Sequence, residues 1–566
     1  MSEQRVVFIR YSGPGRAVGP TRQSGAPTRA GPRPMQKRAD LVTTTSLRGV
    51  SYSLTLMRAS ILDLGSNSFR LLVADVAPDG AIRPVLRARE FLRLGREIAL
   101  TGSFTAEAIK RAVGAAEHLA GLGVRAGAEQ SMALATSAIR DAGNREELVE
   151  RLQAVIGTPI SVIDGREEAR LGFLGVASSI ALPPGNHLVL DLGGGSLELA
   201  VGSGATPVWT GSTDLGVSRL VAECVTSDPL SRDDVAALEA RVRARLEPIV
   251  PQVRQLDPDW CVSVGGPNRA LLRMVIGTSE AWQPATLNQA WMTAAELAAL
   301  RDRLLTMPRA DRLAMPGMKA SRAEQLPAAA VIVATVLGVL GVDKTMASYW
   351  GLREGAILDA YGDAALAFGR ELRPASVARM ERRFSPLGPH DAHVAGLAAS
   401  LFDQLSAVHG MDAVSRELLT YGARLHTIGM GVGFRGYHRH GAYLIENSEL
   451  RGFDPAEIAS LASIVRFARS GTTRTGYPPF ESLDADGRDR IRQQLAILHL
   501  ADTADRGLDQ AVESITLDVG AEEATASLMG IDLELRREWV ESAESVFHDA
   551  FGRRLHFEGV RVVDSF

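Results

Sequence analysis

The pattern of apolar and polar positions changes about two-thirds of the way along the chain. From Ala59 to about residue 361, short apolar runs alternate with glycine-rich turns, and amphipathic stretches such as Ala106 to Leu122 separate them. Such a pattern predicts strands that alternate with helices. From about Ala375 the strand signals disappear and apolar residues recur at helical spacing. The sequence therefore predicts an α/β part followed by a separate helical domain.

Two segments of the α/β part share one pattern. ILDLGSNSFRLLVADV, from Ile61, and LVLDLGGGSLELAVG, from Leu188, each contain an apolar strand that ends in Asp-Leu-Gly, a turn of small residues and a second apolar strand. A short turn between two strands predicts a β-hairpin. Asp63 and Asp191 take equivalent positions in the repeat, so we expect duplicated α/β subdomains that face each other across a cleft.

The chemistry of these turns favours a phosphate ligand. A turn of glycine and serine after a strand exposes backbone N–H groups, which suit phosphate oxygens. One such turn can be a plain hairpin, but two in matching contexts, each preceded by an aspartate, are more informative. Carboxylates beside phosphate imply a divalent cation, most often Mg²⁺. Glu198, seven residues after Asp191, either projects into the same cleft or is an exposed strand carboxylate.

Composition narrows the class of protein. The 566 residues include 62 Lys and Arg against 66 Asp and Glu, a net charge of −4, and 46% are hydrophobic, which excludes a disordered or fibrous protein. Only two cysteines are present, which excludes a disulfide framework and favours a reducing compartment, most simply the cytoplasm. The charge balance argues against a protein whose whole surface is built for nucleic acid, and it leaves room for local basic patches. The uncharged run from Gln325 to Val342 contains Pro327 and predicts a buried helix, not a membrane span.

The first 56 residues differ from the rest. They contain nine Lys and Arg against two acids, a charge of +7, which leaves −11 for residues 57–566. The composition indicates a disordered basic extension, and it also suits an organelle transit peptide. A third interpretation, which we favour, is that Met57 is the true start. The predicted division is therefore 1–56, an extension; 57–187 and 188–361, two subdomains; and 375–566, a helical domain.

Five ordered motifs resemble those of the exopolyphosphatase/guanosine pentaphosphate phosphatase (Ppx/GppA) family. They are ILDLGSNSFRLLVADV, ATSAIRDAGN, GREEARLGFLG, LVLDLGGGSLELAVG and GLREG. The resemblance implies an α/β fold of two actin/sugar-kinase/Hsp70-like (ribonuclease H-like) subdomains around a cleft. It also implies an all-α, HD-like C-terminal domain.

The resemblance also assigns roles to single residues. Without it, Arg140 is an ordinary surface charge and Glu168 complements a helix dipole on a solvated face. With it, Arg140 binds phosphate, Glu168 is the general base, and Asp191 and Glu198 hold Mg²⁺, with Mn²⁺ as an alternative ion; Asp63 joins the metal ligands. The implied phosphate-binding residues are Ser66, Asn67, Ser68, Gly193, Gly194, Gly195 and Ser196.

Two segments depart from the family pattern. The third glycine turn, residues 263–268, contains Pro267, which lacks a backbone donor and puts nucleotide binding there in doubt. In the helical domain, the metal candidates are His393, His426 and Asp502. Thr427 stands where the HD-type pattern has an aspartate, so we predict no catalytic metal there.

We therefore expect an exopolyphosphatase that releases terminal orthophosphate from inorganic polyphosphate by base-activated water attack. The alternatives are a guanosine pentaphosphate phosphohydrolase and a non-catalytic polyphosphate- or alarmone-binding regulator. A sugar or acetate kinase on the same fold does not fit GREEAR or GLREG. The resemblance also implies a homodimer, and we expect neither nucleic acid nor a membrane as a partner.

Overall fold

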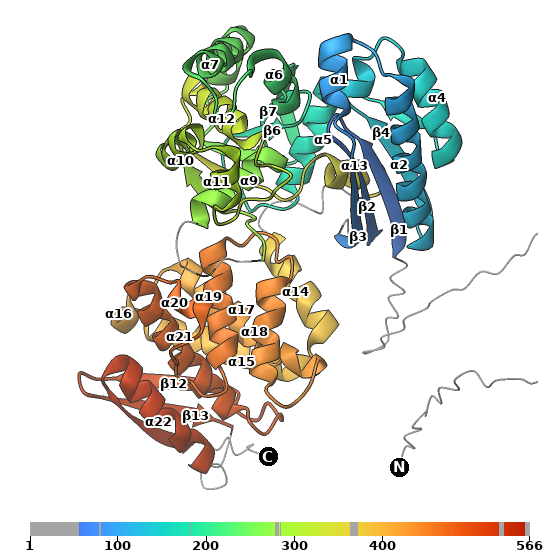
Figure 1. Cartoon of the computed structure of the whole chain (residues 1–566). Helices are drawn as coiled ribbons and strands as arrows, with labels where there is room; N and C mark the ends of the chain where they lie inside the picture. Colours follow the sequence, from blue (N-terminus) through green and yellow to red (C-terminus); the bar gives the residue numbers. More distant parts are fainter. Residues whose placement is uncertain are drawn as a thin grey trace, which may run out of the picture. The chain divides into compact units, whose positions relative to one another are not determined.

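The computed structural model describes residues 56–560, apart from 78–80, 183, 278–281, 283–284, 363–371 and 531–536. The basic segment of residues 1–55 lies outside the described residues, so the prediction of a disordered extension is not tested. The described chain contains two mixed sheets in its first part and a mainly helical part after residue 372 (Figure 1).

The first sheet has five strands in the order β3-β2-β1-β4-β5. These strands are β1 (Met57–Leu64), β2 (Ser68–Val76), β3 (Ile82–Phe91), β4 (Gln130–Ala135) and β5 (Ile160–Val162). The first three are antiparallel neighbours, whereas β4 runs parallel to β1 and β5 parallel to β4. The predicted hairpin is confirmed, and its register places Asp63 opposite Arg70.

The second sheet repeats this topology with one added strand. Its order is β10-β11-β9-β6-β7-β8. The strands are β6 (His187–Leu192), β7 (Leu197–Ser203), β8 (Thr206–Thr213), β9 (Trp260–Val264), β10 (Trp291–Thr293) and β11 (Lys344–Ala347). Strands β6, β7 and β8 match β1, β2 and β3, and β9 runs parallel to β6 as β4 does to β1. The predicted duplication is therefore confirmed.

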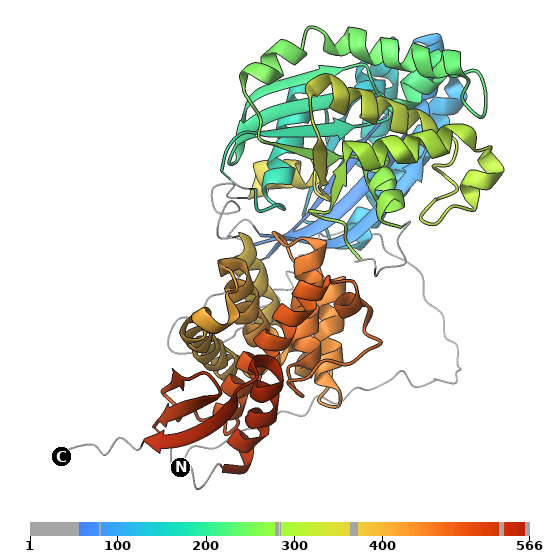
Figure 2. The same cartoon turned by 90° about the vertical axis from the view of Figure 1, so that its left-hand side faces the viewer.

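Helices cover the outer face of each sheet. On the first sheet these are α2 (Ala106–Arg125) and α4 (Arg145–Ile156), with the short helices α1 (Leu94–Thr101) and α3 (Ser137–Arg140) at its end (Figure 1). On the second sheet they are α6 (Val217–Cys224), α7 (Arg232–Leu246), α8 (Val250–Gln255), α9 (Gly266–Ile276), α10 (Ala294–Thr306), α11 (Arg309–Leu313) and α12 (Leu326–Leu340) (Figure 2). The apolar helix α12 is almost wholly buried, as predicted.

Two helices pack on the inner faces of the sheets. On α5 (Gly165–Ala177), Leu171 and Leu174 join the apolar core of the first sheet, whereas Phe173 and Val176 join that of the second. Helix α13 (Leu352–Tyr361) follows the last strand of the second sheet and returns to pack against β1 and α5. The carboxylate of Asp164 accepts a hydrogen bond from the Glu167 amide at 2.8 Å and caps α5. Glu168 therefore lies in the first turn of a firmly packed helix.

The part after residue 372 is mainly helical, as predicted, and has one continuous apolar core. Its helices are α14 (Leu372–Phe384), α15 (Gly388–Gln404), α16 (Ser406–His409), α17 (Ala413–Leu425), η3 (Ile428–Gly431), α18 (Tyr437–Asn447), α19 (Pro455–Phe467), α20 (Pro478–Glu481), α21 (Ala485–Ala504) and α22 (Arg537–Phe551). None of the helices in the described ranges is both long and apolar enough to cross a membrane.

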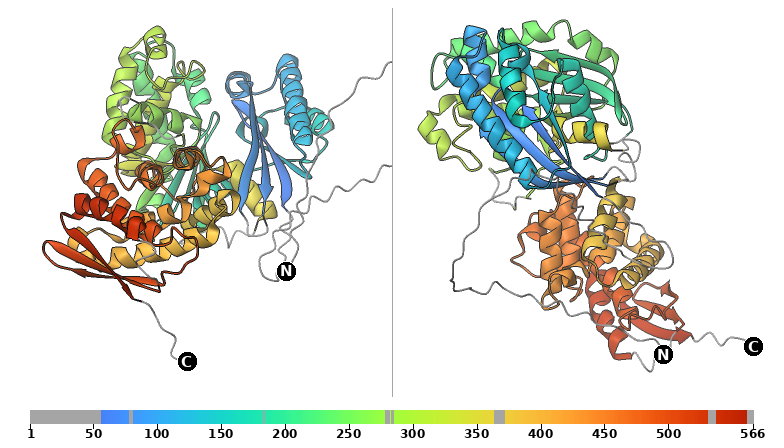
Figure 3. Two further views of the ribbon diagram at one scale, coloured as in Figure 1. Left: turned by 90° about the horizontal axis from the view of Figure 1, so that it is seen from below. Right: turned by 90° about the vertical axis from the view of Figure 1, so that its right-hand side faces the viewer.

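The expectation of an all-α domain is wrong for its last residues. Strands β12 (Ser514–Val519), β13 (Glu523–Met529) and β14 (Arg554–Val560) form a three-stranded sheet (Figure 3). Buried residues alternate with exposed or half-buried ones along β13, a period-two pattern that indicates a half-buried strand. The strands are short and follow long helical segments, so their signal was masked by the dominant helical period.

Candidate active site

The two hairpin turns predicted to bind phosphate lie against each other. A Cβ atom on Gly194 would lie 3.0 Å from the Asn67 side chain, at the limit of close packing. A Cβ atom on Gly195 would lie 2.5 Å from the hydroxyl oxygens of Ser66 and Ser137, which no side chain tolerates. Glycine is therefore required at residue 195 because it allows the second turn to approach the first.

The cleft beside these turns is lined by all of the predicted site residues except Arg140, eleven in total. The predicted residues that line it are Asp63, Ser66, Asn67, Ser68, Glu168, Asp191, Gly193, Gly194, Gly195, Ser196 and Glu198 in full. They come from β1, β2, α5, β6, β7 and the two turns. Arg140 is not among the described residues that line the cleft.

Five carboxylates line this cleft, those of Glu354 and of the four predicted acids. The pKa is raised for Asp63, Glu168, Asp191 and Glu198. Burial is the main cause for all four. The pKa of Glu198 rises to about 8, because the charge of Asp191, its partner across β6 and β7, adds to burial. The pKa of Glu168 rises well above its usual range, because Glu198 adds to burial and Arg140 only partly opposes it. The Ser212 hydroxyl donates a hydrogen bond to Glu198 at 2.9 Å.

This donor set suits a hard divalent cation. Carboxylate oxygens converge on a buried cleft, and their raised pKa values express the cost of placing several negative charges together. A Mg²⁺ or Mn²⁺ ion takes oxygen ligands and would offset that cost. Asp63, Asp191 and Glu198 therefore fit the predicted role of holding the ion, with Glu168 on the adjacent helix.

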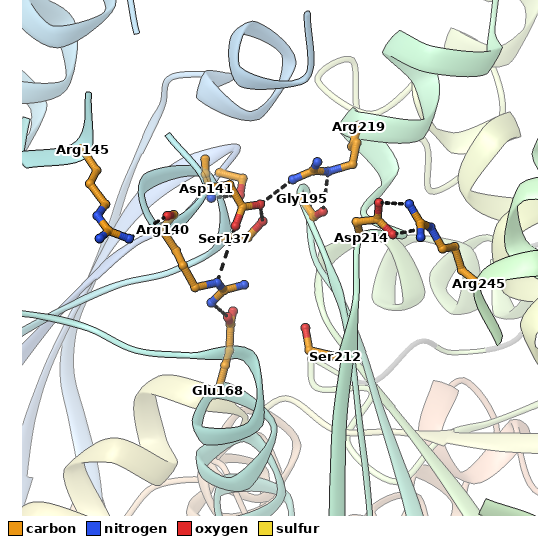
Figure 4. Close-up of polar contacts among 12 residues, drawn as sticks. Ser137, Arg140, Asp141, Arg145, Glu168, Gly195, Ser212, Asp214, Arg219 and Arg245 are labelled. Carbon is orange, nitrogen blue, oxygen red and sulfur yellow. Dashed lines mark hydrogen bonds and ion pairs between the residues drawn. The ribbon is translucent and has the colours of Figure 1, made fainter. Parts of the chain in front are cut away.

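Arg140 contacts the proposed base rather than lying on the surface. Its Nη1 lies 3.3 Å from Oε2 of Glu168 (Figure 4). The same nitrogen donates a hydrogen bond to the carbonyl oxygen of Ile163 at 2.9 Å. The guanidinium is mostly buried, with 21% of its side chain exposed. The structure thus brings Arg140 and Glu168 together, and the arginine approaches the cleft through that carboxylate.

A second arginine joins the two halves of the site. Arg219 of α6 donates from Nη2 to Asp141, next to Arg140, at 2.6 Å, and from Nε to the carbonyl oxygen of Gly195 at 3.1 Å (Figure 4). These bonds tie the end of α3 to the second glycine turn. The position of Arg140 is therefore coupled to the turn across the cleft.

Sequence reasoning missed three arginines that line the cleft. Arg70, Arg269 and Arg353 lie among its lining residues, and Nη1 of Arg70 is 3.8 Å from Oδ2 of Asp63. Arg70 and Arg353 stand inside two of the quoted motifs, ILDLGSNSFRLLVADV and GLREG. The hairpin register, which sets Arg70 opposite Asp63, is the signal that could have identified the first of them.

The third glycine turn also reaches the cleft. Gly265 lines it and has a φ of 96°, and a Cβ atom there would lie 2.5 Å from the Leu192 carbonyl oxygen. Pro267 stands in the first turn of α9, where its missing N–H costs nothing to the helix. Asn268 donates to the carbonyl oxygen of Val264 at 2.7 Å. The prediction that Pro267 disfavours anion or nucleotide binding at this turn is not tested.

The helical domain places a different histidine in the predicted cluster. His390, His426 and Asp502 bring ligand atoms within 4.8 Å of one another. His393 instead directs Nε2 to the carbonyl oxygen of Val512, at 2.8 Å. The prediction of His393 as a member of the cluster is therefore wrong. His390, one turn earlier in helix α15, is the histidine whose side chain faces His426 and Asp502.

Two lobes of one duplicated α/β topology each present a glycine turn and an acidic strand end to a shared cleft, and these features define a two-lobed α/β protein whose cleft suits a phosphate ligand. Comparison with family models specifies the class further. The model of the Ppx/GppA phosphatase family matches residues 72–363, and that of Ppx/GppA phosphatase domain III matches residues 372–548. The chain therefore belongs to the Ppx/GppA phosphatase family.

Solved structures agree with this assignment. The chain is 28% identical to an exopolyphosphatase-like protein of known crystal structure, with a TM-score of 0.51, over 54% of this chain and 98% of that one. It is 26% identical to an exopolyphosphatase from Cytophaga hutchinsonii, with a TM-score of 0.50 and the same coverage. Family membership supports a hydrolase that acts on phosphate.

Proposed function

We propose that this protein is an exopolyphosphatase. With Mg²⁺ or Mn²⁺ bound, it hydrolyses the terminal phosphoanhydride bond of inorganic polyphosphate and releases orthophosphate. The observation that carries the proposal is a basic pocket beside the carboxylate cleft. Its lining includes eight cationic residues and no aspartate or glutamate: Arg70, Arg87, Arg89, Arg269, Arg273, Lys319, Arg322 and Arg353. Arg70, Arg269 and Arg353 line both the pocket and the cleft.

The electrostatics of the pocket favour a polyanion. Burial, followed by repulsion from neighbouring arginines, lowers the pKa of Arg269 and of Arg322 to about 10. The same two causes lower the pKa of Arg89. Like charges held together in a partly buried pocket repel one another, and a bound polyanion relieves that repulsion. A linear polyphosphate carries one negative charge at each unit, so it can pair with several of these cations at once.

The adjacency of the pocket and the cleft supports attack at the end of a chain. With the polymer held by the basic pocket, its terminal phosphate reaches the glycine turns, whose N–H groups face phosphate oxygens. Glu168 accepts a proton from water, the water oxygen bonds to the terminal phosphorus, and the bond from that phosphorus to the bridging oxygen breaks. Orthophosphate leaves, and the polymer is one unit shorter. A bound Mg²⁺ would supply charge neutralisation at the phosphoryl oxygens.

The positive charge of Arg140, which contacts the carboxylate of Glu168, supports proton transfer from water to that carboxylate. Its contact with Glu168 fixes the direction of the carboxylate, and its positive charge favours the ionised form that accepts a proton. General bases work best with a pKa near the operating pH, which an upward shift from the usual range of glutamate provides.

The free thiols bear on the cellular compartment of the protein, and the family resemblance bears on its oligomeric state. Cys224 and Cys261 are both free thiols, which supports a reducing compartment and is consistent with the cytoplasm. The homodimer stays a prediction.

The deciding experiment measures orthophosphate release with Mg²⁺ from long-chain polyphosphate and from guanosine pentaphosphate, at matched concentrations of terminal phosphate. We expect faster release from the polymer. A preference for the nucleotide would replace the proposal with an alarmone phosphatase. Release from neither, with binding of both retained, would make the protein a regulator.

A further inference from the structure

We propose that the helical domain binds one transition-metal ion through His390, His426 and Asp502. The three residues come from α15, from the residue after α17 and from α21, and they are separated by 36 and 76 positions in the chain. The fold alone brings them together, with their ligand atoms within 4.8 Å of one another. The site is separate from the carboxylate cleft and from the proposed hydrolysis there.

The distances within the cluster match those around a four-coordinate ion. Nε2 of His390 lies 3.3 Å from Oδ1 of Asp502, and Nε2 of His426 lies 3.2 Å from the same oxygen. Ligands at about 2.0 Å from a tetrahedral ion are separated from each other by about 3.3 Å. The Asp502 oxygen therefore already lies at ligand separation from both imidazole nitrogens, and the two nitrogens lie within 4.8 Å of each other.

The second ring nitrogen of each histidine, Nδ1, has a hydrogen-bond partner, as it usually does in histidines that bind a metal through Nε2. Nδ1 of His390 lies 2.8 Å from Oδ2 of Asp505, and Nδ1 of His426 lies 2.6 Å from the carbonyl oxygen of Ala423. Acceptors at Nδ1 fix the ring orientation and leave Nε2 as the ligand atom, which is the usual outer arrangement of histidine metal sites.

His426 supplies an independent sign that a ligand is accommodated. Its side chain is 3% exposed, and its Nε2 has no partner in satisfactory hydrogen-bond geometry, although it points at Asp502. A buried polar atom without such a partner is costly in a native protein. A metal ion on Nε2 satisfies that atom.

The donor set selects the class of ion. Two imidazole nitrogens and one carboxylate oxygen suit Zn²⁺, Co²⁺, Fe²⁺ or Mn²⁺, whereas Mg²⁺ prefers oxygen ligands alone. Three protein ligands leave a coordination position open. The Asp502 side chain is 27% exposed, so water or a phosphate oxygen can reach that position.

The neighbouring residues restrict the site to one ion. The Thr427 hydroxyl donates to Asp391 at 2.7 Å, and the Ser385 hydroxyl bonds the same carboxylate. Asp391 therefore has its oxygens occupied by hydroxyl groups. A second ion lacks the bridging carboxylate that it would need, and we assign no reaction to the one bound ion.

The test uses the full-length protein and Co²⁺, whose visible absorption reports nitrogen ligation. The protein is stripped with a chelator and then dialysed against Co²⁺ with Mg²⁺ in excess, because Mg²⁺ competes for the all-oxygen cleft and not for imidazole. We expect about one Co²⁺ per chain with tetrahedral-type absorption. Zn²⁺ should displace it and remove the absorption.

Variants decide whether the ion lies at this cluster. His390→Gln and His426→Gln should lose the bound Co²⁺ and its absorption, whereas His393→Gln, one turn further along α15, and Glu198→Gln in the cleft should retain both. Wild-type protein without Co²⁺ absorption, or a His390→Gln variant that retains it, would overturn the proposal. If neither histidine variant folds, Asp502→Asn at the partly exposed ligand gives the same decision.

Discussion

Removal of one cationic side chain from the basic pocket should weaken the binding of long polyphosphate chains much more than that of short ones. Arg322 lines the basic pocket and also borders a small hollow beside Asp191 and Gly193, but it is not among the residues that line the main carboxylate cleft. Its guanidinium lies against Gly266 at the start of α9. Its pKa is lowered to about 10 by burial and by repulsion from Arg70 and Arg89, which indicates that it adds to a crowded field of positive charge. Arg322→Gln keeps a polar side chain of similar reach and removes the charge.

The size of the effect follows from a single charge-assisted contact. A hydrogen bond between arginine and a charged acceptor contributes about 1.5–3 kcal/mol. A loss of about 1.4 kcal/mol in binding free energy weakens affinity tenfold, so KM for long-chain polyphosphate should rise by about 10- to 100-fold. Turnover at saturation should change little, because the carboxylates and the glycine turns are untouched. Tripolyphosphate, which is short enough to occupy the cleft alone, should show little change in KM.

The assay is orthophosphate release over a range of concentrations of both polymers, at low and at raised ionic strength. The difference between wild type and variant should shrink at high salt, because screening weakens the lost attraction. Lys110→Gln on the exposed side of α2 is the matched control, and it should leave both substrates unaffected. An equal loss for long and short substrates, or no loss for either, would refute the assignment of this pocket to the polymer.

Four other predictions concern the cleft and the basic extension. Glu168→Gln should lower turnover by about 10²–10⁴, the usual contribution of a general base, while polyphosphate binding measured by calorimetry persists. Arg140→Ala should both raise KM and lower turnover in the same release assay. The pKa of Glu198 is raised to about 8, so the folded metal-free protein binds more protons than the unfolded chain between about pH 4.5 and pH 8. Its free energy of unfolding should therefore fall as pH rises through this range. Glu198→Gln should therefore flatten the decline of the thermal midpoint over that range. Deletion of residues 1–56 should leave the release rate unchanged.

Each of the three substitutions has a matched control. Glu167→Gln removes the neighbouring carboxylate, which pairs with Arg170, and should retain turnover. Arg145→Ala removes a half-exposed arginine close to Arg140 in the chain and should retain KM. Glu147→Gln, at an exposed position of α4, should leave the pH dependence of the midpoint as it is. A wild-type rate in Glu168→Gln, or an unfolded protein after deletion of residues 1–56, would contradict the corresponding interpretation.

The sequence by itself determined the elements and most of the chemistry of the cleft. The repeated Asp-Leu-Gly turns predict the two hairpins because an apolar run, a turn of small residues and a second run have only one compact local solution. Their duplication, and the motifs around Arg140 and Glu168, identified the family and the acids. These are local signals, since each depends on residues within one short segment.

Only the tertiary structure decided how separate segments meet. Three features depend on packing between elements that are far apart in the chain: the approach of Gly195 to Ser66, the contact of Arg140 with Glu168, and the cluster of arginines beside the cleft. The same is true of His390, which one turn of helix α15 separates from the incorrectly predicted His393. Helical periodicity shows which residues share a face, but the partner that covers that face is fixed by packing among α15, α17 and α21. Long-range packing, which no local pattern encodes, therefore decided the ligand set and the charge of the pocket.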